Sequence, residues 1–200
     1  MPVRGPKVKI SRALNLALTS KAGRIMEKRP YGPGQHGMAR KRSASVYKTQ
    51  LLEKQRLKHY YNVSEAQLSA AYAKAVRANG STGEAMMQLL ECRVDSLVLR
   101  MGFARSAYAA RQYVAHGHFE INGVRCWTPA HMVKVGDVVS VREKSKNHPQ
   151  IVEASANAGE APAYLEVDRS KLSGKLVSMP VRDQISAPIN EQLVVEFYSR

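Results

Sequence analysis

Four arginines, spaced five to seven residues apart, are the side chains of this sequence best suited to binding an anion. A guanidinium fork matches the geometry of phosphate oxygens and donates two parallel hydrogen bonds to them. Between residues 93 and 116 the only acid is Asp95. The spacing therefore predicts a phosphate-binding surface. A glutamine and a histidine that follow the last arginine are expected to belong to the same surface. The predicted set is Arg93, Arg100, Arg105, Arg111, Gln112 and His116.

Residue types that could catalyse a reaction or hold a metal are present, but they lack the surroundings that such chemistry needs. His116, His118 and His131 have no pair of carboxylates or cysteine close by in the sequence, so no metal site is expected. Cys92 and Cys126 form no Cys-x-x-Cys pair. No Gly-x-Ser-x-Gly elbow surrounds a serine. We expect no catalytic residues, no cofactor and no enzyme activity.

The arginines lie on a predicted helix-helix-strand unit. Asp95 and Ser106 are expected to cap two short helices, which Gly102 and Gly117 end. Helix N-termini and arginine side chains both suit phosphate oxygens, so this unit favours structured RNA as its ligand. It continues with a strand from residue 119, an Asn-Gly turn at 122–123 and a last strand at 138–141.

Further elements are predicted on both sides of this unit. Ser64 and Gln67 form a capping box that starts one helix. Short apolar alternations in the C-terminal part predict strands or extended segments. The ranges are a helix over 44–61, a helix followed by a surface connection over 147–163, and strands near 164–167 and 193–198.

The composition points to a polyanionic partner. The chain has 200 residues, of which 44% are hydrophobic, and 31 Lys and Arg against 16 Asp and Glu give it a net charge of +15. Nucleic acid is favoured over an anionic membrane surface, because no apolar run approaches the ~20 residues that span a bilayer. The start, MPVRGPKVKI, has no apolar segment typical of a secretory signal.

Most of the excess charge lies at the N-terminus, where residues 1–60 contain fifteen Lys and Arg and two acids. Residues 1–45 show little apolar periodicity and many glycines and prolines, which predicts an extended arm that a partner orders. Its segment RPYGPGQHG could follow a phosphate backbone closely. Outside the arginine set, the residues expected to bind RNA are Lys7, Lys9, Arg12, Arg40, Lys41, Arg42, Lys48, Lys54, Arg56, Lys58, Lys144 and Lys146.

Several motifs resemble the bacterial-type ribosomal protein four family of the small subunit. The order R-x-D, R-x-G, A-R-Q-x-V-x-H, N-G and V-x-x-G-D-x-V-x-V over 93–141 is similar to the RNA-binding module named after that protein. RPYGPGQHG and LEKQR resemble the arm and first helix of the family, and the likeness extends over essentially the whole chain. Val8 stands where some members have a first zinc-binding cysteine, so the chain resembles the zinc-free variety.

The resemblance implies an α+β fold with an inserted module. A basic extended arm would occupy 1–45, and a small helical domain 46–92 would be completed by 165–200 packing back on it. The RNA-binding module would occupy 93–155, and 156–164 would connect it to the C-terminal part.

The resemblance also implies a structural constituent of the small ribosomal subunit. Such a protein would be a primary binder of a multi-helix junction in the 5′ domain of small-subunit rRNA, would nucleate subunit assembly and would contribute to translational accuracy. Ribosomal proteins three and five, and mRNA near the channel through which it enters, are the further implied partners, with no membrane. The implied location is the cytoplasmic ribosome, and an organellar ribosome is an open alternative.

Two other functions fit part of the sequence. An RNA-modifying or tRNA-charging enzyme can carry the same module, but it would need a separate catalytic domain for which no stretch of this chain has the size or motif. A protein that compacts DNA without sequence preference fits the charge but not the module.

Overall fold

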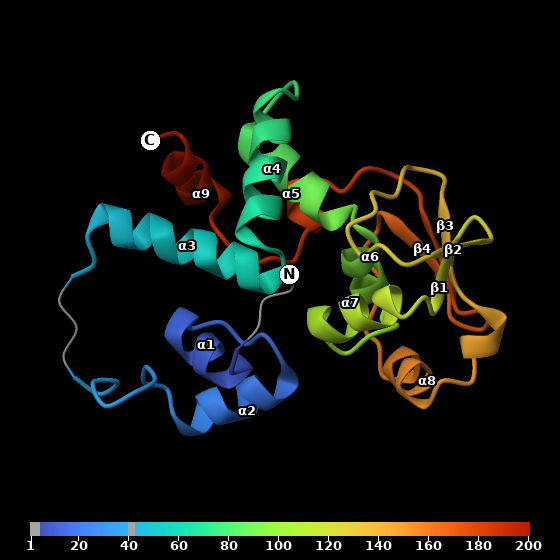
Figure 1. The fold of residues 1–200 in the computed structure, drawn as a ribbon, viewed down its shortest axis with the longest axis horizontal. Helices are drawn as coiled ribbons and strands as arrows, with labels where there is room; N and C mark the ends of the chain where they lie inside the picture. Colours follow the sequence, from blue (N-terminus) through green and yellow to red (C-terminus); the bar gives the residue numbers. More distant parts are fainter. Residues whose placement is uncertain (1–4, 40–42) are drawn as a thin grey trace. The chain divides into compact units, whose positions relative to one another are not determined.

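A computed structural model describes residues 5–39 and 43–200, and the chain divides into two compact units. Unit 1 contains the chain up to Gly83 together with Ala187–Arg200, and unit 2 is Glu84–Ser186. In Figure 1 the colours show that unit 1 joins the N-terminal helices to the red C-terminal helix. Unit 2 is therefore inserted between two parts of unit 1, as the sequence predicted in outline.

Unit 1 is helical in the part that the structure describes. Helix α3 packs against both α1 and α9, and α9 also contacts α4. Side-chain caps start most of these helices, because Thr19, Ser45, Ser64 and Asn190 each accept from a backbone N–H of the first turn. The helices are α1 (Lys7–Leu14), α2 (Ser20–Lys28), α3 (Val46–Tyr60), α4 (Glu65–Val76), the start of α5 (Thr82–Glu91) and α9 (Glu191–Tyr198).

The N-terminal arm is not extended as predicted, because α1 and α2 occupy much of it. Leu14 and Ala22 are buried, so even a sparse apolar pattern stabilises these two short helices once they pack together. Two of the four prolines of the arm and three of its five glycines lie beyond α2, in the segment from Pro30 to Gly37. Residues 40–42, where three RNA-binding side chains are predicted, lie outside the described residues.

Unit 2 combines helices with an antiparallel sheet whose strand order is β2-β1-β3-β5-β4. Its core gathers Phe103, Phe119, Leu97 and Tyr164 from helices, strands and connections. The elements are α6 (Val94–Arg100), α7 (Ala107–Ala115), β1 (Phe119–Ile121), β2 (Val124–Cys126), β3 (Val138–Val141), a 3-10 turn (Glu143–Ser145), α8 (Pro149–Ala156), β4 (Leu165–Asp168), β5 (Ser173–Leu176) and a 3-10 turn (Arg182–Gln184).

Many predicted elements are confirmed. The helix predicted over 44–61 is α3, the predicted capping box starts α4, and the helix predicted within 147–163 is α8. Ser106 caps α7 by accepting from Ala109 N. The turn at Asn122-Gly123 joins β1 to β2, and its two residues have φ values of 50° and 81°. Asp95 does not cap α6, because that helix begins at Val94 and Asp95 lies in its first turn.

The C-terminal part differs from its prediction in two ways. Strands β4 and β5 extend the sheet of unit 2 through β3, so only the chain from Ala187 onward completes unit 1. The segment 193–198 is helical and not extended, because Asn190 caps it through Gln192 N and Leu193 N. A short apolar run does not distinguish a strand from a helix by its period alone. The division between the two compact units falls at 83–84, inside α5, whereas the predicted start of the RNA-binding module is at residue 93.

Candidate nucleic-acid interface

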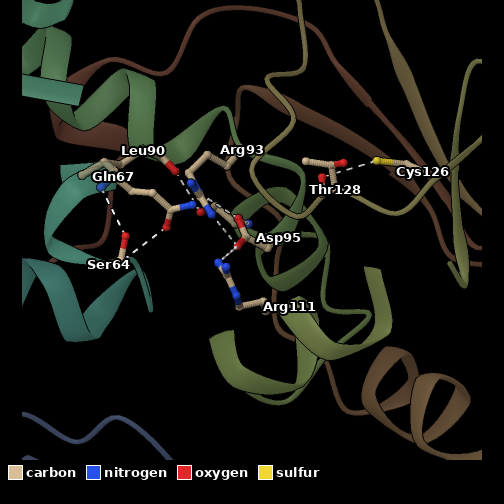
Figure 2. Close-up of polar contacts among 9 residues, drawn as sticks. Ser64, Gln67, Leu90, Arg93, Asp95, Arg111, Cys126 and Thr128 are labelled. Carbon is tan, nitrogen blue, oxygen red and sulfur yellow. Dashed lines mark hydrogen bonds and ion pairs between the residues drawn. The ribbon is translucent and has the colours of Figure 1, made fainter. Parts of the chain in front are cut away.

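Arg93 and Arg111 meet on one buried carboxylate, which we call the Asp95 cluster (Figure 2). Arg93 donates to both Asp95 oxygens at 2.9 and 2.8 Å, and Arg111 Nη1 donates to Oδ2 at 3.3 Å. The side chains of Arg93 and Asp95 are 6% and 4% exposed. Burial lowers the pKa of the Arg111 guanidinium, while the Asp95 carboxylate opposes that shift. Arg93 is therefore a structural residue of unit 2 whose guanidinium solvent hardly reaches.

Arg100 is also directed toward an acid inside unit 2. Its guanidinium pairs with Glu91, whose side chain is fully buried, and Tyr164 donates to the same carboxylate at 2.7 Å. Arg100 additionally donates to Ser186 Oγ at 3.1 Å. Burial, with the charge of Glu91, raises the pKa of Tyr164 well above its usual range. The sequence predicted few acids close to the four arginines, and this is wrong for the folded chain. Glu91 and Glu153 lie outside residues 93–116 in the sequence, but the fold brings them into contact with Arg100 and Arg105.

Arg105 is the arginine of the predicted set that faces solvent. Its side chain is 56% exposed and pairs with Glu153, which is 55% exposed. Such a surface ion pair contributes little stability, so a phosphate can replace the carboxylate at low cost. Gln112 on α7, His116 just after the end of α7, and Lys144 are exposed as well. Exposure of these side chains is what a phosphate-binding surface requires.

In unit 1, Lys54 and Lys58 of α3 meet Glu65 of α4, which we call the Glu65 cluster. Lys54 Nζ lies 2.8 Å and Lys58 Nζ 3.2 Å from the Glu65 oxygens, and Tyr198 Oη donates to Oε1 at 2.9 Å. Lys54 also lies 4.5 Å from the ring centroid of Phe197. Partial burial raises the pKa of Glu65, but the hydrogen bonds from Lys54, Tyr198 and Lys58 outweigh it and lower the pKa below 4.5. These lysines hold three helices of unit 1 together.

Two arginines of unit 1 fix the N-terminal region by donating to main-chain carbonyls. Arg12 donates to Tyr31 O at 3.2 and 2.9 Å and to Gly32 O at 3.1 Å, and its guanidinium lies 5.0 Å from the Tyr31 ring centroid. Arg56 of α3 donates to Leu14 O at 2.8 Å and pairs with Glu53. Both are half-buried. Their positions give them structural roles in addition to any role in RNA binding.

The structure thus separates the predicted site residues by exposure. Exposed members lie in both units. Lys54 and Arg93 are buried. The prediction for Arg40, Lys41 and Arg42 lies outside the described residues. The exposed members are Lys7, Lys9, Lys48, Arg105, Gln112, His116 and Lys144. The half-buried members are Arg12, Arg56, Lys58, Arg100, Arg111 and Lys146.

Sequence reasoning missed an exposed pair at the end of β2, Arg125 and Trp127. The guanidinium carbon of Arg125 lies 3.8 Å from the centroid of the Trp127 ring. Residues i and i+2 of an extended segment lie on the same face, so an Arg-x-Trp sequence after an Asn-Gly turn was a signal that could have found this pair.

Both cysteines and most of the histidines lie in unit 2. Among the described residues, no group of three His, Cys, Asp or Glu side chains is placed to hold a metal ion. Burial lowers the pKa of His118, and the neighbouring His148, His116, Arg125 and Arg142 lower it further. Cys92 is buried and its pKa is raised to about 11 by burial and by Glu91, so its thiol is unreactive.

Across residues 5–39 and 43–200 no helix has the length and apolar character needed to cross a membrane.

Comparison with known proteins places these features in one family. Residues 2–91 match the ribosomal protein S4/S9 N-terminal domain, and residues 92–139 match the S4 domain. The chain is similar to the small ribosomal subunit protein uS4 of Streptomyces avermitilis, with 51% identity covering 98% of this chain and 97% of the relative. Proteins of the same name from Thermobifida fusca and Chlorobium phaeobacteroides are 45% and 43% identical, covering 100% and 98% of this chain and the same shares of the relatives.

These relatives are named as ribosomal proteins and not as enzymes, so the comparisons lend no support to an RNA-modifying or tRNA-charging activity. The identity extends over nearly the full length of both chains, and the two matched domains follow one another in the order predicted from the motifs. The chain belongs to the small ribosomal subunit protein uS4 family.

Proposed function

We propose that this chain is a structural constituent of the small ribosomal subunit and binds the rRNA of that subunit directly. The observation that carries the proposal is full-length similarity to proteins named for this role, over both the N-terminal and the S4 domains. The net charge of +15 and the exposed cations of both units supply the attraction that an RNA backbone needs.

The more specific part of the proposal is that the ligand is a multi-helix junction in the 5′ domain. Base edges in the deep groove of A-form RNA are poorly accessible, so a protein must read the placement of several backbones. Cations on two separate units are suited to backbones that come from different helices. A protein that binds such a junction early would nucleate subunit assembly.

Ribosomal proteins three and five, and mRNA near the channel through which it enters, complete the proposed surroundings. A contribution to translational accuracy would pass through the contact with protein five. These partners rest on the family resemblance of the motifs over 93–141 and at both ends of the chain.

The test is binding of the purified chain to a 5′-domain rRNA fragment that contains the junction. Duplex RNA and duplex DNA of equal length serve as competitors, at low and near-physiological salt. We expect a preference for the junction that persists at higher salt, because shape recognition depends less on counterion release than non-specific binding does. Equal and weak binding of all three nucleic acids would contradict the proposal and favour a non-specific binder.

Matched variants of unit 2 then test which cations contact the RNA. Arg105→Ala with Lys144→Ala removes two exposed charges of the predicted set, and Lys171→Ala with Lys175→Ala removes two exposed charges outside it. We expect the first pair to weaken junction binding by about 1–3 kcal/mol and the control pair by less than half of that. An equal loss for both pairs would mean that net charge, and not position, governs binding.

A further inference from the structure

A tryptophan lies exposed just beyond strand β2. Trp127 is 52% exposed, and it is the only tryptophan of the chain. The buried Cys126 precedes it, so the chain turns one side chain into unit 2 and the next toward solvent. Indole rings carry a large apolar area and are usually at least partly covered, so this ring has a surface suited to a flat ligand.

Arg125 lies over this ring as a fixed cation. Its guanidinium carbon is 3.8 Å from the indole centroid. Nε donates to Gly117 O at 3.1 Å, and Nη2 donates to His116 O at 3.2 Å. These two bonds hold the guanidinium over the indole before any ligand arrives. A ligand that uses the pair therefore loses little side-chain entropy on binding.

Residues next to the pair hold Arg125 and Trp127 in this arrangement. Gly117 has a φ of 71°, and a Cβ at this position would lie 2.4 Å from Arg125 Nε, so a side chain here would displace the guanidinium. On the other flank, Cys126 Sγ contacts Thr128 O at 3.5 Å (Figure 2), and His131 N donates to the same oxygen at 3.0 Å. The segment that carries Trp127 is thus held on both sides.

The charge around the pair favours a nucleic acid as its occupant. Residues 93–146 contain nine Lys and Arg against four acids. Arg93 and Arg100 pair with acids inside unit 2, but Arg125 itself and His116, whose carbonyl accepts from it, are exposed. Every base has a π-face that stacks on an aromatic ring, and an arginine beside the ring adds attraction for a phosphate. Bases inside a duplex are already stacked, so the available ligand is an unpaired base.

We propose that Trp127, with Arg125 fixed over it, is a stacking platform for an unpaired base of the bound RNA. The proposal rests on the proposed function as an rRNA-binding protein and names a contact of unit 2 that reads single-stranded RNA. The indole supplies the flat apolar surface. The guanidinium supplies positive charge close to the sugar-phosphate of the same nucleotide.

The single tryptophan makes the experiment direct, because all indole fluorescence of the chain comes from the platform. The full chain is titrated with the 5′-domain fragment, with a single-stranded oligoribonucleotide and with duplex RNA of equal length. We expect quenching by the fragment and the single strand and much less by the duplex. Trp127→Leu should weaken binding of the fragment about 5- to 100-fold, and Trp127→Phe should weaken it less because a ring remains.

Two further variants separate the platform from general effects. Arg125→Met keeps a long side chain but removes the charge, and we expect a several-fold loss of affinity for the fragment. Val135→Ala removes another exposed apolar side chain of unit 2, which is 49% exposed, and should leave the affinity unchanged. Thermal unfolding of each variant checks that exposed positions have been changed without loss of the fold.

The outcomes distinguish this proposal from the proposed function. If the chain prefers the junction but its fluorescence and the affinity of Trp127→Leu stay unchanged, the platform is wrong and rRNA binding stands. If no preference for the junction exists, both proposals fail. If Trp127→Leu binds the fragment normally but no longer binds other small-subunit proteins on it, the surface is a protein contact and the platform is wrong.

Discussion

The Asp95 cluster of unit 2 and the Glu65 cluster of unit 1 both join one carboxylate to two cations, but water reaches them to very different extents. The Asp95 side chain is 4% exposed, whereas that of Glu65 is 44% exposed. A buried charge depends on its partners, since water does not replace them, while a half-exposed charge can turn to solvent. The same arrangement of one carboxylate and two cations is therefore a buried part of the core in unit 2, whereas in unit 1 it contributes only modestly to stability.

The comparison also shows why a count of arginines overestimates a phosphate-binding surface. In unit 2, Arg93 and Arg100 are held by Asp95 and by Glu91, and Arg105 remains well exposed. In unit 1, Lys54 is buried against Glu65, while Lys7, Lys9 and Lys48 are exposed. Each unit devotes some cations to its own fold and leaves others accessible.

The largest expected effect comes from breaking the Asp95 cluster. Asp95→Ala leaves the buried Arg93 guanidinium without a counter-charge, and we expect a loss of about 3–5 kcal/mol in the free energy of unfolding of unit 2. Urea unfolding followed by the fluorescence of Trp127 reports on this unit, because the only tryptophan lies within it. A loss below about 1 kcal/mol would show that Arg93 finds water or another partner.

A double variant serves as the control for this prediction. Arg93→Met with Asp95→Leu replaces the buried ion pair by apolar side chains of similar size, which removes the unpaired charge. We expect this variant to be clearly more stable than Asp95→Ala. If the two variants are equally unstable, the loss comes from packing and not from a buried charge.

Within unit 1, the next largest effect is expected from Arg12, which contacts main-chain carbonyls of the arm. Arg12→Ala should cost about 1–2 kcal/mol in local stability, because charged donors make the stronger hydrogen bonds. Hydrogen exchange of the Gly37 amide, which donates to Gly34 O at 3.1 Å, should become faster. Lys9→Ala on the same helix is exposed and serves as the control. Unchanged exchange in Arg12→Ala would mean that the arm is held by other contacts.

A smaller effect is expected from the Glu65 cluster, and it should depend on pH. Glu65→Gln should cost about 1 kcal/mol at pH 7, a value kept low because the side chain is 44% exposed. The pKa of Glu65 is lowered from 4.5 in the folded chain, so its contribution is present above about pH 4.5 and is lost as the pH falls through the folded value. Unfolding of both proteins at pH 7 and pH 3 measures this. A difference that persists at pH 3 would contradict it.

The smallest effect is expected from His118, whose pKa is lowered from 6.5 by burial and by the positive groups around it. Because the unfolded chain binds this proton more readily, the stability that the neutral histidine contributes is present above about pH 6.5 and declines below it. We expect His118→Asn to reduce the loss of stability between pH 7.5 and 5.5 by a few tenths of a kcal/mol. His116→Asn, which changes an exposed neighbour, should reduce it less.

Local signals in the sequence predicted a large part of the fold. Ser64 with Gln67 and Ser106 with Ala109 form caps within four residues, so their partners are visible in the sequence. The Asn122-Gly123 turn and the strand before it are equally local. The strand near 164–167 was also predicted and is β4. The failures lie where contacts are distant, as in the arm, where α1 and α2 depend on packing, and in the pairing of β4 with β5 and of β5 with β3, which adds both strands to the sheet of unit 2.

By itself the sequence determined the family, the excess of positive charge at the N-terminus and the helices and turns that have local caps. Only the tertiary structure decided which cations are accessible. The acids that pair with Arg100 and Lys54 are nine and eleven residues away, and Arg105 pairs with Glu153 from another helix. Exposure of a charged side chain is set by which distant residues the fold brings beside it. Residue type and spacing therefore predicted an RNA-binding protein, but they did not predict which of its cations the fold leaves exposed.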